Sequence, residues 1–107
     1  MKIRDIINGE KPTLSFEVFP PKKDTDFANV EAAAFGIAGL SPSYMSVTYG
    51  AGGSTKGHTI ALAQAIQEKY NVPTIAHLTC VCANREGIKA ALSELKSAGI
   101  ENILALR

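Results

Sequence analysis

Four short apolar runs recur along the chain, and segments with helical periodicity separate them. Each run is rich in Val, Ile, Phe, Tyr and Thr and follows turn residues, which is typical of strands. These runs cover residues 13–18, 44–49, 74–78 and 102–106. Apolar residues three to four positions apart predict helices between the strands. The helical segments are about 26–40, 55–70 and 85–98, with a short opening helix at 3–8.

Each long helix is expected to bury one stripe of apolar residues. We expect the stripes to contain Phe27, Val30, Ala34 and Ile37, then Ile60, Ala63, Ile66 and Tyr70, then Ile88, Ala91, Leu92 and Leu95. Asn84 has the position of an N-cap for the last helix. Gly99 has the position of a left-handed residue just after that helix. The sequence therefore predicts where this last helix begins and ends.

Strictly alternating strands and helices indicate a parallel sheet with right-handed crossovers. Polar residues near the ends of the four runs, namely Glu17, Thr48, His77 and Arg107, recur about every 30 residues. An eight-unit barrel of about 250 residues has about the same spacing. Flavodoxin-like units have similar lengths. We predict that residues 1–107 form a partial barrel domain, the N-terminal half of a (β/α)8 TIM barrel with four parallel strands alternating with helices.

One face of each of the first three strands becomes polar toward its C-terminal end. The polar residues are Ser15 and Glu17, then Ser46 and Thr48, then His77 and Thr79. Because barrel enzymes have their active sites at that end of the strands, we expect these faces to line a site. Four strands leave two open edges and an uncovered interior, so we also predict a homo-oligomer.

Composition excludes several classes of partner. The net charge is +1, with Lys and Arg scattered among Asp and Glu, so no nucleic-acid partner is expected. No apolar run approaches the roughly 20 residues of a membrane-spanning helix. Cys80 and Cys82 are read as free, buried thiols in a reducing compartment, which predicts a cytoplasmic protein. Their spacing is also unlike that of structural zinc ligands, so no metal site is predicted.

Four motifs follow the strand order. They are Ser-Phe-Glu-Val-Phe-Pro-Pro-Lys at 15–22, Ser-Val-Thr-Tyr-Gly-Ala at 46–51, His-Leu-Thr-Cys at 77–80 and Ile-Leu-Ala-Leu-Arg at 103–107. In order and spacing they resemble the motifs of methylenetetrahydrofolate reductases. The resemblance covers essentially the whole chain, but only about the first third to half of a complete family member. It implies a TIM-barrel flavoprotein of one-carbon metabolism and methionine synthesis.

The resemblance also implies a reaction. FAD at the barrel mouth would accept a hydride from NAD(P)H and pass it to 5,10-methylenetetrahydrofolate, giving 5-methyltetrahydrofolate. The protein orients the cofactor and tunes its electrostatics. With only four strands, the 107-residue chain is expected to be inactive alone. A different reading is a non-catalytic half-barrel that folds by oligomerisation, and a third is another barrel enzyme with a similar strand-end pattern.

Glu17 matches the family's catalytic carboxylate, which protonates a folate nitrogen so that the five-membered ring can open. A carboxyl group buried among Phe16, Val18 and Phe19 would keep its proton and act as this acid. A strand-end Glu is otherwise solvated or paired with Lys. Thr48 matches a position that contacts the flavin and lies near the pteridine, although a strand Thr is often satisfied by a backbone carbonyl.

His77, Leu106 and Arg107 match further cofactor-binding positions of the family. His77 would contact the flavin, but a lone His on a strand is usually a satisfied core residue. The guanidinium group of Arg107 would pair with the pyrophosphate, whereas a terminal residue can also be frayed.

The Gly-Ala-Gly-Gly-Ser sequence at 50–54 precedes a helix, as phosphate-binding loops do. It lacks the Gly-Lys-Ser/Thr ending of a Walker A motif, so a flexible strand–helix loop is the preferred interpretation. Just beyond it the family often carries Arg and Asp, where this chain has Lys56, Gly57 and His58. No function is assigned to His58 from the sequence.

Overall fold

The computed structural model describes residues 1–49 and 56–107, apart from the side chain of Lys56. Helices and strands alternate along the chain as the hydrophobic pattern predicts. In order, the elements are α1 (Ile3–Ile7), β1 (Ser15–Val18), a 3-10 turn (Asp24–Asp26), α2 (Phe27–Ala38), β2 (Tyr44–Val47), α3 (Lys56–Tyr70), β3 (Thr74–Thr79), α4 (Arg85–Ser97) and β4 (Asn102–Leu106).

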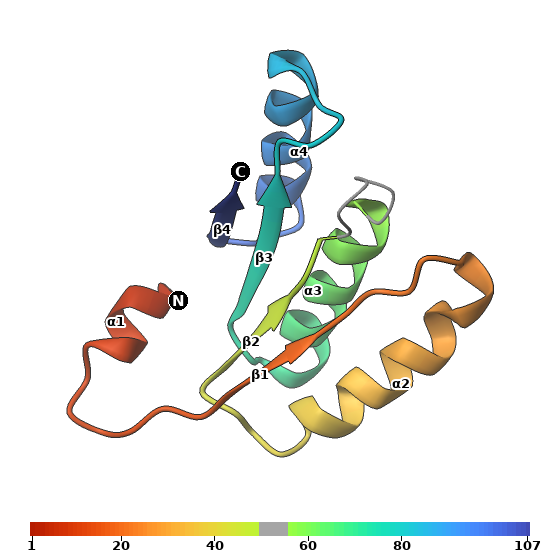
Figure 1. Ribbon diagram of the computed structural model, residues 1–107. Coiled ribbons are helices and arrows are strands. Elements are labelled where there is room, and N and C mark those ends of the chain that lie inside the picture. Colours follow the sequence, from red (N-terminus) through yellow and green to blue (C-terminus); the bar gives the residue numbers. More distant parts are fainter. Residues whose placement is uncertain (50–55) are drawn as a thin grey trace.

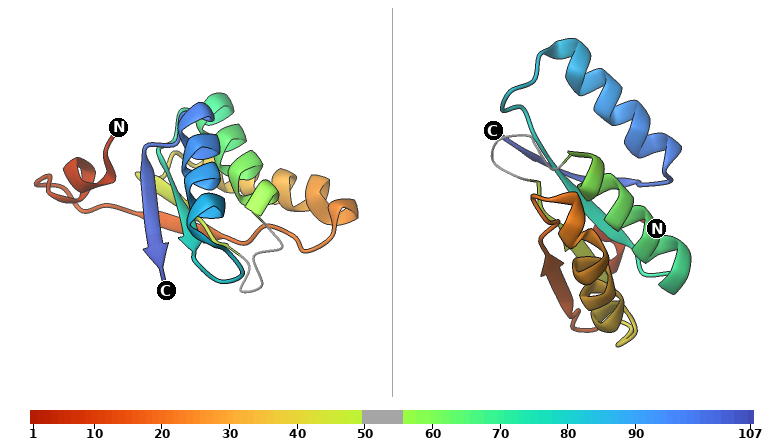
Figure 2. Two further views of the ribbon diagram at one scale, coloured as in Figure 1. Left: turned by 90° about the horizontal axis from the view of Figure 1, so that it is seen from above. Right: turned by 90° about the vertical axis from the view of Figure 1, so that its right-hand side faces the viewer.

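The four strands form one parallel sheet in the order β1-β2-β3-β4. Neighbouring strands are consecutive in sequence, because each helix carries the chain across to the next parallel strand. Helices α2, α3 and α4 all lie on one face of the sheet, and none of them covers the other, open face (Figures 1 and 2). The predicted half-barrel arrangement of four parallel strands and their helices is confirmed.

The hydrophobic core lies between the sheet and the three long helices. Met45, Val47 and Ala76 point from the two central strands toward the helices and are fully buried. Leu62 and Ile66 of α3 are also fully buried, in the same cluster. Because α3 contacts both α2 and α4, its buried surface is wide and includes Leu62, which the predicted stripe omits.

The two ends of α4 have the predicted caps. The Asn84 side chain accepts a hydrogen bond from the backbone N–H of Gly87 at 2.8 Å, which satisfies one free donor of the first turn. After the helix, Gly99 has a φ of 74°, a left-handed conformation that favours glycine. Both local predictions are therefore confirmed.

Two residues of the predicted stripes are exposed. Leu92 of α4 is 42% exposed, because within the described part of the chain no helix packs on the outer side of α4. Tyr70 is 40% exposed at the last position of α3, where its ring lies 5.3 Å from that of Phe35. Periodicity identifies the side of a helix that faces the sheet. It does not show whether another helix packs against the remaining sides.

The last strand is the most exposed part of the sheet. Leu104 and Leu106 are 44% and 41% exposed on the open face, and Ile103 is 38% exposed on the other face. The short helix α1 lies near the start of β4, away from the other helices (Figure 1). None of the helices formed by the described residues covers the C-terminal end of the open face (Figures 1 and 2).

Candidate functional site

Three polar side chains come together on the open face of the sheet, toward the C-terminal ends of the strands. Glu17 is in register with Ser46 on β2, and Ser46 is in register with Ile75 on β3. His77 lies two residues beyond Ile75, so side-chain alternation puts it on the same face. The parallel register thus brings together residues from three consecutive strand–helix units.

The contacts within this group converge on one carboxylate oxygen. The hydroxyl of Ser46 donates a hydrogen bond to Oε2 of Glu17 at 2.9 Å. Nε2 of His77 lies 3.4 Å from the same oxygen, an electrostatic contact longer than a usual hydrogen bond. Among the described residues, Oε1 of Glu17 has no partner, so one oxygen is anchored and the other is available.

The environment of Glu17 differs from the expected one. Its side chain is 48% exposed, whereas the sequence suggested a carboxyl group buried among three apolar residues. Phe16 and Val18 alternate to the helix-covered face, and Phe19 is 67% exposed. The prediction that its sequence neighbours bury Glu17 is therefore wrong, because strand alternation turns Phe16 and Val18 away from it.

Thr48 follows the last residue of β2 and is half-buried. Its backbone N–H donates to the carbonyl of Val18 at 3.0 Å, and its carbonyl accepts from the Thr59 hydroxyl at 2.8 Å. Both backbone groups of Thr48 are thus held in place. Within the described part of the chain its own hydroxyl has no hydrogen-bond partner, so a ligand can use it.

Leu106 and Arg107 take different positions at the end of β4. Leu106 is in register with Thr79 and shares the open face with His77. Arg107 follows the strand, is exposed, and has no ion-pair partner among residues 1–49 and 56–107. The structure therefore groups Glu17, His77 and Leu106 on one face, and leaves the Arg107 guanidinium free beside its C-terminal end.

Ser46 lies on the polar face that the sequence predicts to line a site, but its contact with Glu17 is not predicted, because a serine on a strand carries no signal of its own. Its partner becomes evident only from the register, which aligns Ser46 with Glu17. The spacing of about 30 residues between strand ends contained this information, although not at the accuracy of a single position.

The remaining candidate motifs have different outcomes. The loop at 50–54 falls outside the described residues. Cys80 and Cys82 are free and exposed rather than buried, because the chain turns away from the sheet directly after β3. Cys82 adopts a φ of 58°. In the described segments, no three potential His, Cys, Asp or Glu ligands gather into a metal-binding group.

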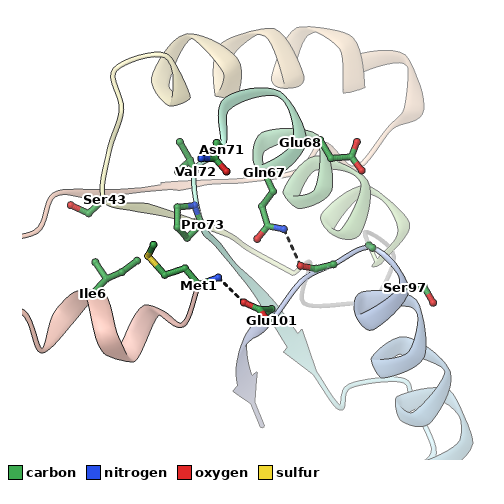
Figure 3. Close-up of a pocket in the computed structure, with 12 residues that line it drawn as sticks. Met1, Ile6, Ser43, Gln67, Glu68, Asn71, Val72, Pro73, Ser97 and Glu101 are labelled. Carbon is green, nitrogen blue, oxygen red and sulfur yellow. Dashed lines mark hydrogen bonds and ion pairs between the residues drawn. The ribbon is translucent and has the colours of Figure 1, made fainter.

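A cavity of about 830 Å³ lies at the opposite end of the sheet (Figure 3). Its lining includes Ser43, Pro73 and Glu101, which each precede a strand, together with Met1 and Ile6. In parallel barrels the chemistry takes place at the C-terminal ends of the strands. The cavity is therefore distinct from the Glu17 site, and its position is that of a structural end of the domain.

The open-face site combines a proton donor or acceptor with groups that can orient a ligand. Glu17 offers a carboxylate oxygen and Thr48 a hydroxyl that have no partner among residues 1–49 and 56–107, and Leu106 offers an apolar surface on the strand next to that of His77. Such a set suits a flat, partly polar ligand lying across the strand ends. No helix formed by the described residues is long and apolar enough to cross a membrane.

Comparison with known proteins gives one consistent result. The family model "Methylenetetrahydrofolate reductase" matches residues 2–107. "Methylenetetrahydrofolate reductase (NADH) 1" of Arabidopsis thaliana is 37% identical over 99% of this chain, and "Methylenetetrahydrofolate reductase 2" of Schizosaccharomyces pombe is 38% identical over 100%. "5,10-methylenetetrahydrofolate reductase" of Pectobacterium carotovorum subsp. carotovorum is 32% identical over 88%.

These relatives are much longer than the chain. The matched region is 18% of the Arabidopsis protein, 17% of the Schizosaccharomyces protein and 32% of the Pectobacterium protein. The match to the family model includes Glu17, Ser46 and His77.

Proposed function

The chain belongs to the methylenetetrahydrofolate reductase family. We propose that it contributes the part of a folate-reducing active site that contains Glu17. The proposed reaction is the FAD-dependent reduction of 5,10-methylenetetrahydrofolate to 5-methyltetrahydrofolate with NAD(P)H. The observation that carries this proposal is the position of Glu17. Its carboxylate lies on the open face near the C-terminal strand ends. One of its oxygens is anchored, and the other has no partner in the described part of the chain.

The residues at the strand ends fit a flavin. Thr48 offers a hydroxyl and His77 an imidazole for polar ring atoms, Leu106 offers an apolar surface, and Arg107 offers a guanidinium for the pyrophosphate. When bound, FAD would supply hydride transfer between the nicotinamide and the folate. The support for this assignment is the Thr48 hydroxyl, which none of the described residues engages, and the shared face of His77 and Leu106.

Glu17 would donate a proton to a nitrogen of the five-membered folate ring. The carbon–nitrogen bond then opens to an iminium ion, which accepts the hydride at carbon. We assign the proton to Oε1, because Ser46 and His77 already contact Oε2. A ligand lying over the open face would exclude water from this half-exposed carboxyl group. Ser46 and His77 would hold the group in one orientation.

The test uses a chimera in which residues 2–107 replace the matching segment of the Pectobacterium relative. Glu17→Gln should lower folate reduction by a factor of about 10² or more, as expected when a general acid is removed. NADH oxidation with a quinone acceptor should stay near the unmutated rate, because it needs no proton on folate. Glu10→Gln, a change at an exposed carboxyl group before β1, is the matched control. Equal losses in both reactions would make Glu17 a structural residue.

A second candidate is a non-catalytic half-barrel that is stabilised by self-association. The observation in its favour is the open sheet, with Leu104 and Leu106 exposed and with edge strands at β1 and β4. Two copies related by a two-fold axis would pair β1 of each with β4 of the other and complete an eight-stranded ring. Burying about 800 Å² per partner would be typical of a specific interface.

Two measurements on the purified chain separate these candidates. Light scattering at low micromolar concentration should show a dimer or a larger assembly, whereas an 11.3 kDa monomer with a cooperative melt would contradict self-association. Absorption spectra after addition of FAD test the flavin proposal independently. A chain that associates and takes up no flavin favours the second candidate.

A further inference from the structure

His58, in the first turn of α3, contacts the segment that connects β1 to α2. Its Nδ1 lies 2.9 Å from the carbonyl oxygen of Pro21, and its Nε2 lies 2.6 Å from Oδ1 of Asp24. The ring also lies 5.3 Å from the ring of Phe27. Only 22% of the His58 side chain is exposed. Both ring nitrogens are thus occupied by groups from a segment more than thirty residues earlier in the chain.

The chemistry of the two partners determines the protonation state that fits them. A backbone carbonyl oxygen only accepts hydrogen bonds, and an ionised carboxylate also only accepts. The side chain of Asp24 is 93% exposed. A neutral imidazole has one N–H and can satisfy only one of the two acceptors. An imidazolium ring has two N–H groups and satisfies both.

The segment that His58 holds begins directly beside the site. Glu17 and Val18 end β1, and the chain then passes through exposed Phe19 to Pro20 and Pro21, which are buried. The Pro21 carbonyl is therefore fixed four residues after Glu17. Holding this carbonyl and Asp24 against α3 determines how the chain leaves the strand, and hence where Phe19 lies at the edge of the open face.

We propose that His58, as an imidazolium ion, is a positioning residue that fastens the β1–α2 connection to α3 and so sets the edge of the site beside Glu17. Its importance for folate reduction rests on the proposed function, whereas the attachment itself does not. Asp24 is the titratable side chain that contacts the ring among the described residues, and the nearby Lys22 and Lys23 are exposed.

Limited digestion with trypsin tests the attachment, because Lys22 and Lys23 are cleavage sites within the connection. His58→Gln removes the positive charge. The amide oxygen of the introduced glutamine would face one of the two acceptors and could not form a hydrogen bond with it. Cleavage at these lysines should become about tenfold faster, a factor of the size expected for losing a hydrogen bond between charged groups. His58→Arg keeps a cation with several donors and should restore slow cleavage. Cleavage at Lys89 in α4 serves as the internal reference.

Unchanged cleavage in His58→Gln, or fast cleavage in a folded His58→Arg, would overturn the proposal. If the variants do not fold, nuclear magnetic resonance on the unmodified chain decides. Two ring N–H proton signals from His58 at pH 6, protected from exchange with water, are expected. One signal or none would refute the imidazolium. Neither experiment contains folate or FAD. An inactive chimera would therefore not contradict the attachment of the connection by His58, and failure of the attachment proposal would not contradict the proposed folate reduction.

Discussion

At the N-terminal end of the sheet, two amide side chains bridge backbone groups from distant segments, whereas at the C-terminal end the polar side chains mainly contact one another. The Oδ1 of Asn102 accepts from the backbone N–H of Ile3, and its Nδ2 donates to the carbonyls of Met1 and Thr74. Gln67 similarly accepts from the N–H and hydroxyl of Thr74 and donates to the carbonyl of Gly99.

The C-terminal end has a different design. Glu17, Ser46 and His77 share one oxygen atom, and the other carboxylate oxygen and the Thr48 hydroxyl have no partner within the described part of the chain. An amide that meets its hydrogen-bond capacity within the protein stabilises the fold and has nothing left for a ligand. A group with unused hydrogen-bond donors or acceptors contributes less to stability but can bind a ligand. The comparison therefore assigns stability mainly to one end and ligand contacts to the other.

The largest expected loss of stability comes from Asn102→Leu, which removes a bridging amide at the N-terminal end of the sheet. Three hydrogen bonds disappear and partly buried backbone groups lose their partner, so the free energy of unfolding should fall by about 2–3 kcal/mol. Urea unfolding followed by circular dichroism measures this change. Asn29→Leu, an exposed change on α2, is the control and should have little effect. Similar losses in both variants would show that Asn102 is not a structural bridge.

Most of the fold follows from the sequence, because strands and helices on a parallel sheet have strong periodic signals. The four strands and their order are found to within two residues at each end, and both caps of α4 are found from single residue types. The exposure of Leu92 and Tyr70 is missed because it depends on which neighbouring helix is present, and that is not a local property.

The site is only partly contained in the sequence. Glu17 and His77 come from family motifs and do lie 3.4 Å apart, but their contact requires the register of three strands. The hydrogen bond between Ser46 and Glu17 is missed for the same reason. His58 receives no function from the sequence because its partners, Pro21 and Asp24, are more than thirty residues away and belong to no motif with it.

A smaller effect is expected at the C-terminal end, and it sharpens the comparison. Ser46→Ala should change the free energy of unfolding by less than about 0.5 kcal/mol, because its hydrogen bond joins a half-exposed carboxylate that water can solvate instead. The same change in the chimera should slow folate reduction, since Glu17 loses an anchor. A loss of stability as large as that of Asn102→Leu would contradict the division between the two ends.

The smallest expected effect is a pH dependence at the N-terminal end. Glu101 accepts a hydrogen bond from the Met1 ammonium group at 2.6 Å. This bond first, then the ammonium charge and the charge of Lys2, lower the pKa of Glu101 below its ordinary value of 4.5. Because the folded state holds the carboxylate more strongly than the unfolded state does, the contribution is present above the ordinary pKa. It is lost as the pH falls through the lowered one. Half of the Glu101 side chain is exposed to water, which keeps the effect small. Urea midpoints of the chain and of Glu101→Gln should therefore differ slightly at pH 6 and approach each other as the pH falls through the lowered pKa. A difference that grew on acidification would have the wrong sign for this ion pair.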